Sequence, residues 1–394
     1  MRPDSDFSLD DGAIAALLRR AQAAAGEGTA ILARASAGDP IDAAESAALW
    51  LSPVCSTADL FAAARSARAR RGALLETFSP LYLTNTCDAE CKMCGMRRDN
   101  AALARETADE DAIAVQLATL AARGMYGVAL LTGEYRGKGR TWAIARVRHA
   151  LGIALDIGFR HVLVNMGSLE EDELAELLRD VPRRPDGAFL PKITMCTFQE
   201  TYSRERYARF MGTSAENPRA DFARRLANFD RSRRSGLRVA NPGILVGLNP
   251  DLAFEIVALV QHVHHLAGRG MEVYVSAPRL RPIAGGQSVG GIDDESFVRL
   301  IAVLALALPD AKLVLTTREP RAMQQRLAPL VAVLSAGSAA VAPYSASSTT
   351  FPLAASQFEV TDQRPFEEIL GEHLPPGGGI INYRPETAGP AGSR

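Results

Sequence analysis

The stretch LYLTNTCDAECKMC (residues 81–94) joins two features that together indicate the fold. It opens on a short apolar run, LYLTN (81–85), which has the composition of a β-strand. CDAECKMC (87–94) follows, and it holds three of the five cysteines of the chain within eight residues. Because three charged residues lie between those cysteines, we expect this second part to be a loop directly after a strand.

Similar apolar runs recur along the chain, and a longer stretch with helical periodicity follows most of them. The other seven runs are residues 127–134, 161–167, 193–199, 243–248, 271–280, 312–318 and 331–338. Their nearly continuous apolar character suits parallel strands that are buried on both faces. Eight strand–helix units within roughly 250 residues predict an α/β fold, a (β/α)8 TIM-type barrel. Its chemistry is expected at the carboxyl ends of the strands.

The regions before and after these units differ in composition. Residues 1–76 are rich in Ala, Arg and Leu at helical spacing, and they are predicted to form a helical N-terminal extension. The barrel is predicted to span residues 77–345. Residues 346–394 are predicted to form a C-terminal segment that ends in a flexible tail rich in Gly and Pro.

Composition and charge narrow the classes of protein. The chain is 47% hydrophobic, has a net charge of −1 and a pI of about 6.6, so it lacks the basic excess of a nucleic-acid binder. It contains no apolar run of about 20 residues, the length needed to cross a bilayer. Its first residues are acidic, unlike a secretory signal, and the cysteine count is odd. We therefore expect reduced thiols in the cytoplasm and neither a membrane nor a nucleic-acid partner.

The spacing of Cys87, Cys91 and Cys94 indicates a metal site. Structural zinc sites use four ligands, whereas only three thiols are present here and no histidine is adjacent. A [4Fe–4S] cluster held by three cysteines leaves one iron open to a small molecule, which suits catalysis better than electron transport. Cys55 and Cys196 each lie alone in an apolar run, and we interpret them as core residues.

A Cys-x3-Cys-x2-Cys loop after the first strand of a barrel resembles the radical S-adenosylmethionine (SAM) superfamily. The resemblance implies that the open iron binds the amino and carboxylate groups of SAM. One electron from an external reductant, of flavodoxin or ferredoxin type, then yields a 5′-deoxyadenosyl radical. The residue before the third cysteine usually touches the adenine and is usually aromatic. Here it is Met93, whose polarizable side chain suits the same contact.

Further SAM-binding residues follow from the same resemblance. LLTGE (130–134) resembles the Gly-Glu element that receives the SAM amino group, which implies this role for Gly133 and Glu134. FQETY (198–202) resembles the segment that binds the ribose hydroxyls, which assigns them to Glu200. The stretch that begins RRLANFD resembles one whose arginine meets the SAM carboxylate, and Arg225 matches that position.

The order of several short motifs is similar to the aromatic amino acid lyase branch of the superfamily. The motifs include SPLYLTNTC, GILVGLNPD, YVSAPRLRP, LTTREP, LSAGS and QFEVTDQRPFEEI. The likeness runs from about residue 78 to residue 368. It implies an enzyme that abstracts hydrogen from the amino group of a free aromatic L-amino acid and then fragments a bond at the α-carbon.

Three residues near the carboxyl ends of the predicted strands are candidates for holding the substrate. Arg318 lies at the tip of the seventh strand, where its planar fork suits a substrate carboxylate. Ser335 and Tyr82 lie on the eighth and first strands, which adjoin the seventh in a closed ring. They are expected to hydrogen-bond to the same carboxylate or to the amino group.

The substrate is predicted to be L-tryptophan. The loop at 206–222 has no histidine, whereas tyrosine lyases of this branch usually have one, so the chain most resembles the tryptophan lyases of thiopeptide antibiotic biosynthesis. Their product is 3-methylindole-2-carboxylate. No cysteine follows Cys196, which excludes the second cluster of the hydrogenase-maturation lyases. A tyrosine Cα–Cβ lyase of the 2-iminoacetate synthase type and a non-catalytic Fe–S or zinc protein remain as alternatives.

Overall fold

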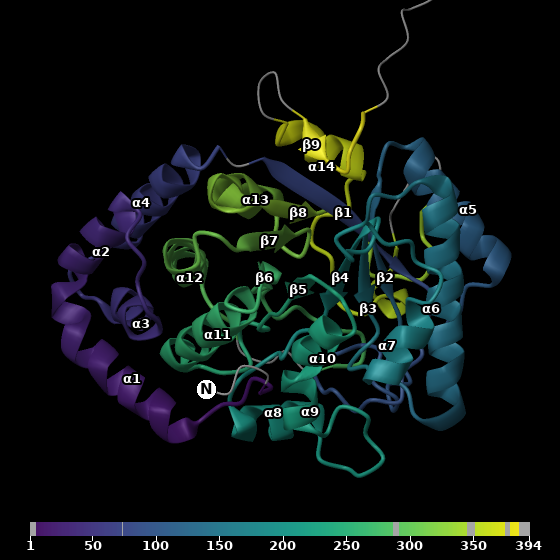
Figure 1. Cartoon of the computed structure of the whole chain (residues 1–394), viewed down its shortest axis with the longest axis horizontal. Helices are drawn as coiled ribbons and strands as arrows, with labels where there is room; N and C mark the ends of the chain where they lie inside the picture. Colours follow the sequence, from purple (N-terminus) through teal and green to yellow (C-terminus); the bar gives the residue numbers. More distant parts are fainter. Residues whose placement is uncertain (1–4, 73, 287–290, 345–350, 375–378, 386–394) are drawn as a thin grey trace, which may run out of the picture.

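Eight parallel strands close into a barrel, as the sequence predicts (Figure 1). The computed structural model describes residues 5–72, 74–286, 291–344, 351–374 and 379–385. Around the ring the strands follow their chain order, and β1 pairs with both β2 and β8 to close it. The strands are β1 (Leu75–Tyr82), β2 (Gly127–Leu131), β3 (His161–Asn165), β4 (Lys192–Cys196), β5 (Val239–Asn241), β6 (Glu272–Ser276), β7 (Lys312–Thr316) and β8 (Val333–Ser335). All eight carboxyl ends therefore lie at one rim.

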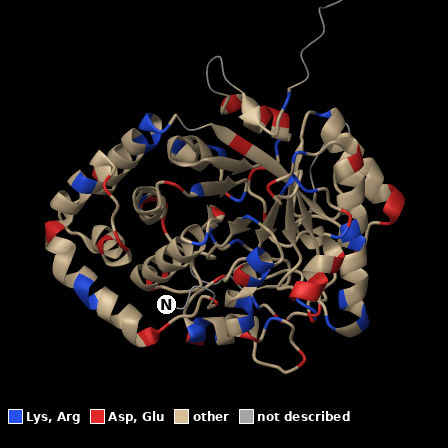
Figure 2. Cartoon of the chain, in the orientation of Figure 1, with Lys and Arg blue, Asp and Glu red and all other residues tan. Residues whose placement is uncertain are grey.

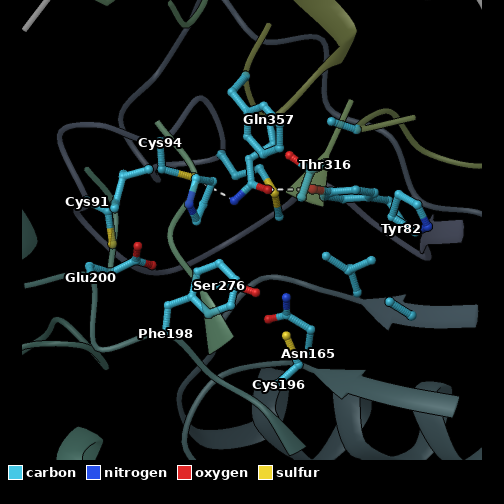
Figure 3. Close-up of a pocket in the computed structure, with 18 of the residues that line it drawn as sticks. Tyr82, Cys91, Cys94, Asn165, Cys196, Phe198, Glu200, Ser276, Thr316 and Gln357 are labelled. Atoms are coloured by element: carbon cyan, nitrogen blue, oxygen red, sulfur yellow. Dashed lines mark hydrogen bonds between the residues drawn. The ribbon is translucent and has the colours of Figure 1, made fainter. Parts of the chain in front are cut away.

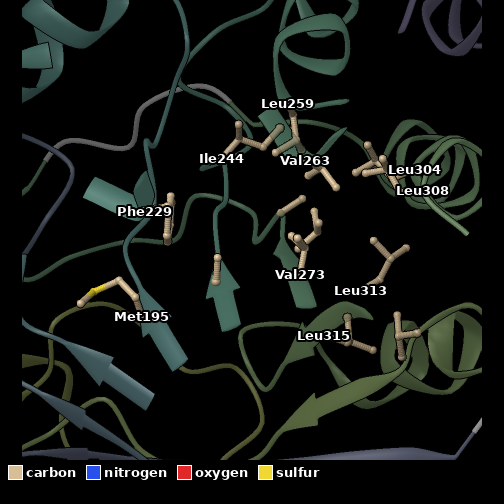
Figure 4. Packing of buried hydrophobic residues seen from close by; sticks show 14 of the residues in the cluster. Met195, Phe229, Ile244, Leu259, Val263, Val273, Leu304, Leu308, Leu313 and Leu315 are labelled. Atoms are coloured by element: carbon tan, nitrogen blue, oxygen red, sulfur yellow. The ribbon is translucent and has the colours of Figure 1, made fainter. Parts of the chain in front are cut away.

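Helices surround the barrel, and apolar side chains fill the layer between the helices and the strands. In Figure 4, Val273 and Leu313 of the strands lie near Leu259, Val263 and Leu304 of the helices. Burial of this apolar layer is the main favourable contribution to folding. The helices after β1 are α5 (Glu110–Ala122), α6 (Gly137–Ile157), α7 (Glu171–Leu177), α8 (Arg204–Met211), α9 (Phe222–Leu226), α10 (Asn228–Arg234), α11 (Leu252–Ala267), α12 (Asp294–Ala307), α13 (Arg321–Leu327) and α14 (Phe366–Glu372).

The N-terminal residues form helices, as their composition predicts. These are α1 (Asp11–Ala24), α2 (Gly28–Ala37), α3 (Ala43–Leu51) and α4 (Thr57–Arg70), and they form an arc outside α11 and α12 (Figure 1). Asp42 and Ser56 each begin a helix with a reciprocal capping box. The division of the chain into three domains remains a prediction, although β1 already begins two residues before the expected barrel boundary.

Two predicted strands lie elsewhere than expected. β1 begins at Leu75 and not at residue 81, and it contains Pro80, a residue that is unfavourable in most strands. The fifth strand is Val239–Asn241, directly before the apolar run at 243–248. Pro242 lacks an N–H group, and the run after it forms only isolated bridges, such as the one between Ile244 and Glu200. The sequence did not distinguish this buried rim segment from the strand.

Part of the predicted flexible tail is ordered. β9 (Ile380–Ile381) pairs in parallel with the start of β1, and Asn382 accepts a hydrogen bond from the backbone of Tyr126 at 2.7 Å. A short hydrophobic pair among Gly and Pro residues gave no periodic signal, so the pairing was not expected. Residues 386–394, the end of the predicted tail, lie outside the described residues.

Acidic and basic residues are interspersed over the outer helices, in keeping with the small net charge (Figure 2). A helix needs about 20 apolar residues to cross a bilayer. None of the helices within the described ranges meets the requirements of length and apolarity for such a span.

A partly buried ionic layer lies across the barrel at the amino ends of its strands. Lys312 of β7 contacts both Glu272 of β6, at 2.6 Å, and Glu76 of β1. Lys192 of β4 pairs with the same Glu272 at 3.0 Å, and Tyr274 donates to Glu76 at 2.5 Å. The mutual pairing offsets the cost of burying these charges. The open end of the barrel is therefore the rim of carboxyl ends.

His161, at the start of β3, makes the stability of this end depend on pH. Burial, with Lys192 nearby, lowers the pKa of His161 to about 3, from an ordinary value of 6.5. The unfolded chain therefore binds a proton below pH 6.5 that the folded chain does not, so the free energy of unfolding must fall as the pH decreases from about 6.5 toward 3. One such group contributes up to about 1.4 kcal/mol per pH unit.

Denaturant unfolding at pH 7 and pH 5 tests this expectation. His161→Gln should lose less stability between the two pH values than the wild type does, because one titrating group is removed. His149→Gln, at an exposed position on α6, is the matched control and should keep the wild-type dependence. An unchanged pH dependence in His161→Gln would contradict the assignment.

Candidate functional site

One cavity at the carboxyl ends of the strands brings together all the predicted site residues. Figure 3 shows part of its lining, including Tyr82, Cys91, Cys94 and Glu200. The strand ends, the loop after β1 and a segment near the C-terminus form its walls. The predicted residues that line it are Tyr82, Cys87, Cys91, Met93, Cys94, Gly133, Glu134, Glu200, Arg225, Arg318 and Ser335. Residues separated by more than 250 positions in the chain thus meet in one site.

The three thiols lie on a loop that its own backbone holds in shape. Cys94 donates its N–H to the carbonyl of Cys91 at 3.0 Å, and Lys92 donates to the carbonyl of Phe210 in α8 at 2.8 Å. Apolar residues of α8 pack against Met93, which is buried. Contacts within the protein therefore hold the loop in shape, as the preorganisation of a metal site requires.

The surroundings of the thiols fit an iron–sulfur cluster. Burial, with the other two thiols nearby, raises the pKa of Cys87 to about 12, and burial raises that of Cys91 to about 11. Buried thiols of this kind need a cation to become thiolates. Two backbone N–H groups already point at the Cys87 sulfur, from Ala89 at 3.4 Å and Glu134 at 3.3 Å, as donors to a metal-bound thiolate do.

The same geometry does not fit a single metal ion. Among the described residues, no three His, Cys, Asp or Glu side chains converge on one point as a mononuclear site requires. In a cubane cluster each cysteine binds a different iron, so the three sulfurs surround a body and need not meet at a point. The three cysteines thus match the ligand count of a cluster with one open iron.

Two glycines allow close approaches beside the thiols: Gly133 lets the end of β2 approach the thiol loop, and Gly167 lets the loop after β3 approach the Glu134 side chain. A Cβ atom on Gly133 would lie 2.1 Å from the carbonyl oxygen of Thr86 and 2.7 Å from Cys87. Gly167 has a φ of +93°, and a Cβ there would lie 2.3 Å from the carboxyl carbon of Glu134. Only glycine fits at both positions, and the carboxylate of Glu134 is thereby held at the wall of the cavity.

Four charged side chains form a buried group beside the thiols. Glu134 accepts from Arg225 at 3.1 Å and from the backbone of Ser168 at 3.1 Å. Arg219 lies 3.0 Å from Glu200 and 3.7 Å from Glu134. The acids and arginines thus neutralise one another, and polar ligand groups can exchange with these partners without leaving a charge unpaired.

Arg219 is a site residue that the sequence did not single out. Burial alone would lower its pKa, but Cys91, Glu200 and Glu134 outweigh burial and raise it well above its ordinary value. Its Nε is buried and makes no hydrogen bond within the described part of the chain. Burial and the neighbouring Arg219 lower the pKa of Arg225. Arg219 lies in the loop after α8, where arginine has no periodic signature, so only the fold reveals its position.

Arg318, Tyr82 and Ser335 border the part of the cavity formed by β7, β8 and β1. The ring order places these strands side by side, as predicted. The guanidinium of Arg318 stacks on Phe358 at 3.4 Å from the ring centroid, and burial lowers its pKa. No acceptor among the described residues takes a hydrogen bond from this guanidinium, so a partly buried cation lines the cavity without an anion. The hydroxyl of Tyr82 donates to Gln357 at 2.5 Å.

A C-terminal strap, residues 351–363, crosses the rim and was also not predicted. Its backbone bonds to the loops after four strands: Ala354 to Ala104, Gln357 to Ala339, Glu359 to Pro282 and Asp362 to Thr317, at 2.8–3.1 Å. It supplies Gln357 and Phe358 to the cavity. The sequence shows neither strand nor helix periodicity in the strap, because its order comes from contacts with distant loops.

The two remaining cysteines are buried. Cys55 lies in the outer core, as expected. Cys196 packs inside the barrel but also lines the cavity, and its thiol donates to Asn241 at 3.3 Å. Burial raises its pKa to about 12.

Comparisons with known proteins agree with this geometry. The Biotin and Thiamin Synthesis associated domain matches residues 276–372, which include β7, β8 and the strap. The 2-iminoacetate synthase of Escherichia coli is 32% identical over 68% of this chain and 67% of its own length. That of Salmonella typhimurium is 28% identical over 72% and 70%.

Solved structures share the fold. HydG, a maturase of the [FeFe]-hydrogenase, superposes with a TM-score of 0.77 at 25% identity, over 94% of this chain and 79% of its own. Methylornithine synthase (PylB) superposes with a TM-score of 0.66 at 18% identity, over 89% and 97%, and shows the fold alone. The thiol loop, its rim position and these relatives lead to one conclusion: the chain belongs to the aromatic amino acid lyase branch of the radical SAM superfamily, whose enzymes use a [4Fe–4S] cluster and SAM.

Proposed function

We propose that this enzyme converts L-tryptophan to 3-methylindole-2-carboxylate. The observation that supports a free amino acid as the substrate is the Arg318 guanidinium, which lines the same cavity as the three thiols and has no partner anion within the described residues, and the absence of a histidine from the described lining favours tryptophan. A partly buried cation of this kind is stabilised by a carboxylate, the group that every free amino acid carries. Arg318, Tyr82 and Ser335 hold the carboxylate and the amino group of the substrate.

Each residue of the thiol side has a proposed role. Cys87, Cys91 and Cys94 ligate the [4Fe–4S] cluster, and Met93 contacts the adenine of SAM. Glu134, beside Gly133, receives the SAM amino group, Glu200 the ribose hydroxyls and Arg225 the SAM carboxylate. Arg219 shares the last role, because it lies between the two acids. Cluster and SAM together supply a 5′-deoxyadenosyl radical after one electron arrives from a flavodoxin- or ferredoxin-type reductant.

The chain contributes orientation and exclusion of water. The strand-end residues fix the amino group relative to the radical source, and this decides which hydrogen is abstracted. The rim loops and the strap surround the cavity and keep water from the reactive intermediates. An indole side chain suits the apolar part of the lining, which includes Phe78, Leu131 and Phe198. No histidine is among the described lining residues to pair with a phenol.

A second candidate substrate is L-tyrosine. The two curated relatives are both 2-iminoacetate synthases, which favours the tyrosine Cα–Cβ lyase reaction. Both candidates need the same cluster, the same SAM site and the same carboxylate anchor. They differ in the contacts of the aromatic ring, so only a product assay separates them.

The product assay is an anaerobic turnover of the reconstituted enzyme with SAM and dithionite. With L-tryptophan we expect 5′-deoxyadenosine and 3-methylindole-2-carboxylate, and with L-tyrosine neither 5′-deoxyadenosine nor p-cresol. Formation of p-cresol, with no indolic product, would contradict the substrate. Arg318→Gln removes the carboxylate fork and should raise the KM for tryptophan about 10- to 100-fold, as the loss of a charged hydrogen bond does. Arg326→Gln, in an exposed ion pair on α13, is the matched control.

A cluster with three cysteine ligands and one open iron predicts which cysteines are needed to bind iron. Cys87→Ala, Cys91→Ala and Cys94→Ala should each lose most of the iron and sulfide that the wild type binds, about four of each per chain. Cys196→Ala is the matched control, because its thiol lies in the same cavity but on β4. It should keep the full iron content and the rhombic change of the EPR signal on adding SAM. Loss of the cluster in Cys196→Ala would show that the fourth iron has a protein ligand.

Because Gly167 leaves room for the Glu134 carboxylate, substitution of Gly167 is predicted to change the affinity for SAM. Gly167→Ala places a methyl group against the Glu134 carboxylate and should weaken SAM binding about tenfold or more, measured by isothermal titration with the reconstituted enzyme. Gly158→Ala is the matched control, since Gly158 has a φ of +96° but no atom within 4 Å of the added Cβ. Equal losses of SAM affinity in both variants would assign the effect to backbone strain instead.

A further inference from the structure

Gln357 of the strap connects the cluster side of the cavity to the substrate side. Its Nε2 lies 3.2 Å from the sulfur of Cys94, and its Oε1 lies 2.5 Å from the hydroxyl of Tyr82 (Figure 3). The orientation of the amide follows from its partners. A cysteine thiolate only accepts hydrogen bonds, so the NH₂ group must face Cys94, and the carbonyl oxygen then accepts the Tyr82 proton.

The backbone holds Gln357 in this position. Its N–H donates to Ala339 in the loop after β8 at 3.0 Å, and its carbonyl accepts from Gly95 at 2.8 Å. Gly95 directly follows Cys94, and a Cβ at Gly95 would lie 2.7 Å from that same carbonyl oxygen. The backbone of the strap therefore lies in direct contact with the backbone of the thiol loop. This contact fixes the position from which the Gln357 side chain reaches the Cys94 sulfur.

We infer that Gln357 is a positioning residue that raises the reduction potential of the cluster by donating a hydrogen bond to the Cys94 sulfur. Hydrogen bonds to cluster sulfurs stabilise the reduced, more negative state, and so they raise the potential. Tyr82 strengthens the effect, because a donor to the carbonyl oxygen polarises the amide and makes its N–H a better donor. This inference depends only on the cluster and holds for either amino acid substrate.

The position of Tyr82 adds a consequence that rests on the proposed function. If the substrate carboxylate lies at Arg318, it competes with Gln357 for the hydroxyl of Tyr82. The amide then loses polarisation, its hydrogen bond to sulfur weakens, and the potential of the cluster falls. Substrate occupancy is in this way communicated to Cys94 through three side chains and no backbone movement.

The test is an EPR-monitored redox titration of the reconstituted enzyme, without SAM or substrate. Gln357→Met keeps the length of the side chain but has no N–H donor. We expect it to disfavour reduction about tenfold, which is 59 mV lower for a one-electron couple. Gln325→Met, on the exposed face of α13, is the matched control and should leave the potential unchanged. A wild-type potential in Gln357→Met with full iron content would overturn the inference.

Tyr82→Phe removes the hydrogen bond from Tyr82 to Gln357 and leaves the strap intact, so it tests the same chain of hydrogen bonds. It removes only the donor to Oε1, so the potential should fall in the same direction but by less. If Gln357→Met binds too little iron for a titration, this variant decides: an unchanged potential in Tyr82→Phe overturns the inference.

A titration with saturating amino acid tests the consequence for substrate binding. The potential of the wild type should fall on adding the amino acid that the enzyme turns over, and that of Tyr82→Phe should not change. If the amino acid does not shift the potential of the wild type, the proposed link between substrate binding and the cluster is wrong. If Gln357→Met nevertheless has a lowered potential, the proposed role of the hydrogen bond from Gln357 to the Cys94 sulfur stands. The product assay does not depend on either redox titration. A wrong substrate assignment would therefore be detected independently of the effect of Gln357 on the reduction potential.

Discussion

The closure of the parallel sheet between β8 and β1 is the constraint on which the rest of this structure depends. Parallel pairing aligns every strand in one direction, so closing the ring places eight carboxyl ends at a single rim. The register of this last seam sets Phe78 beside Ser335, and so it carries the loop after β1 to the loops after β7 and β8. The thiols and Arg318 therefore lie at the same rim. At the opposite end the ionic layer around Glu76 and Lys312 leaves the rim as the open face.

Burial of charge is the second principle of the site. Glu134, Glu200, Arg219 and Arg225 are held where water has little access, and each acid has an arginine partner. Such a group is costly to build but does not reorganise much when a zwitterionic ligand such as SAM exchanges one partner for another. Arg318 differs from these four, since it has a stacked aromatic ring but no anion among the described residues. In one half of the cavity the acids and arginines neutralise one another, whereas the half around Arg318 lacks a negative charge. This difference is expected for a cavity that binds two different ligands.

The strap connects these two halves. It belongs to the segment matched by the Biotin and Thiamin Synthesis associated domain, and it bonds to the loops after β1, β6, β7 and β8. Through Phe358 it fixes the plane of Arg318, and through Gln357 it contacts both Cys94 and Tyr82. A segment whose regular structure is limited to one 3-10 turn, Leu353–Ala355, therefore connects the metal side and the amino acid side of the cavity.

The sequence by itself determined the barrel, the cysteine trio and the residues at the strand ends. Each of these has a local signature: apolar runs at regular intervals, thiols at a fixed spacing, and polar residues that directly follow a strand. These residues line one cavity together with Met93, Gly133, Glu134, Glu200 and Arg225, which were chosen from the resemblance to the radical SAM superfamily. The tertiary structure alone decided the true position of β5, the pairing of β9, and the places of Arg219 and Gln357. These residues carry no periodic pattern, because long-range hydrogen bonds and buried ion pairs hold them, and such contacts exist only after distant segments have packed together.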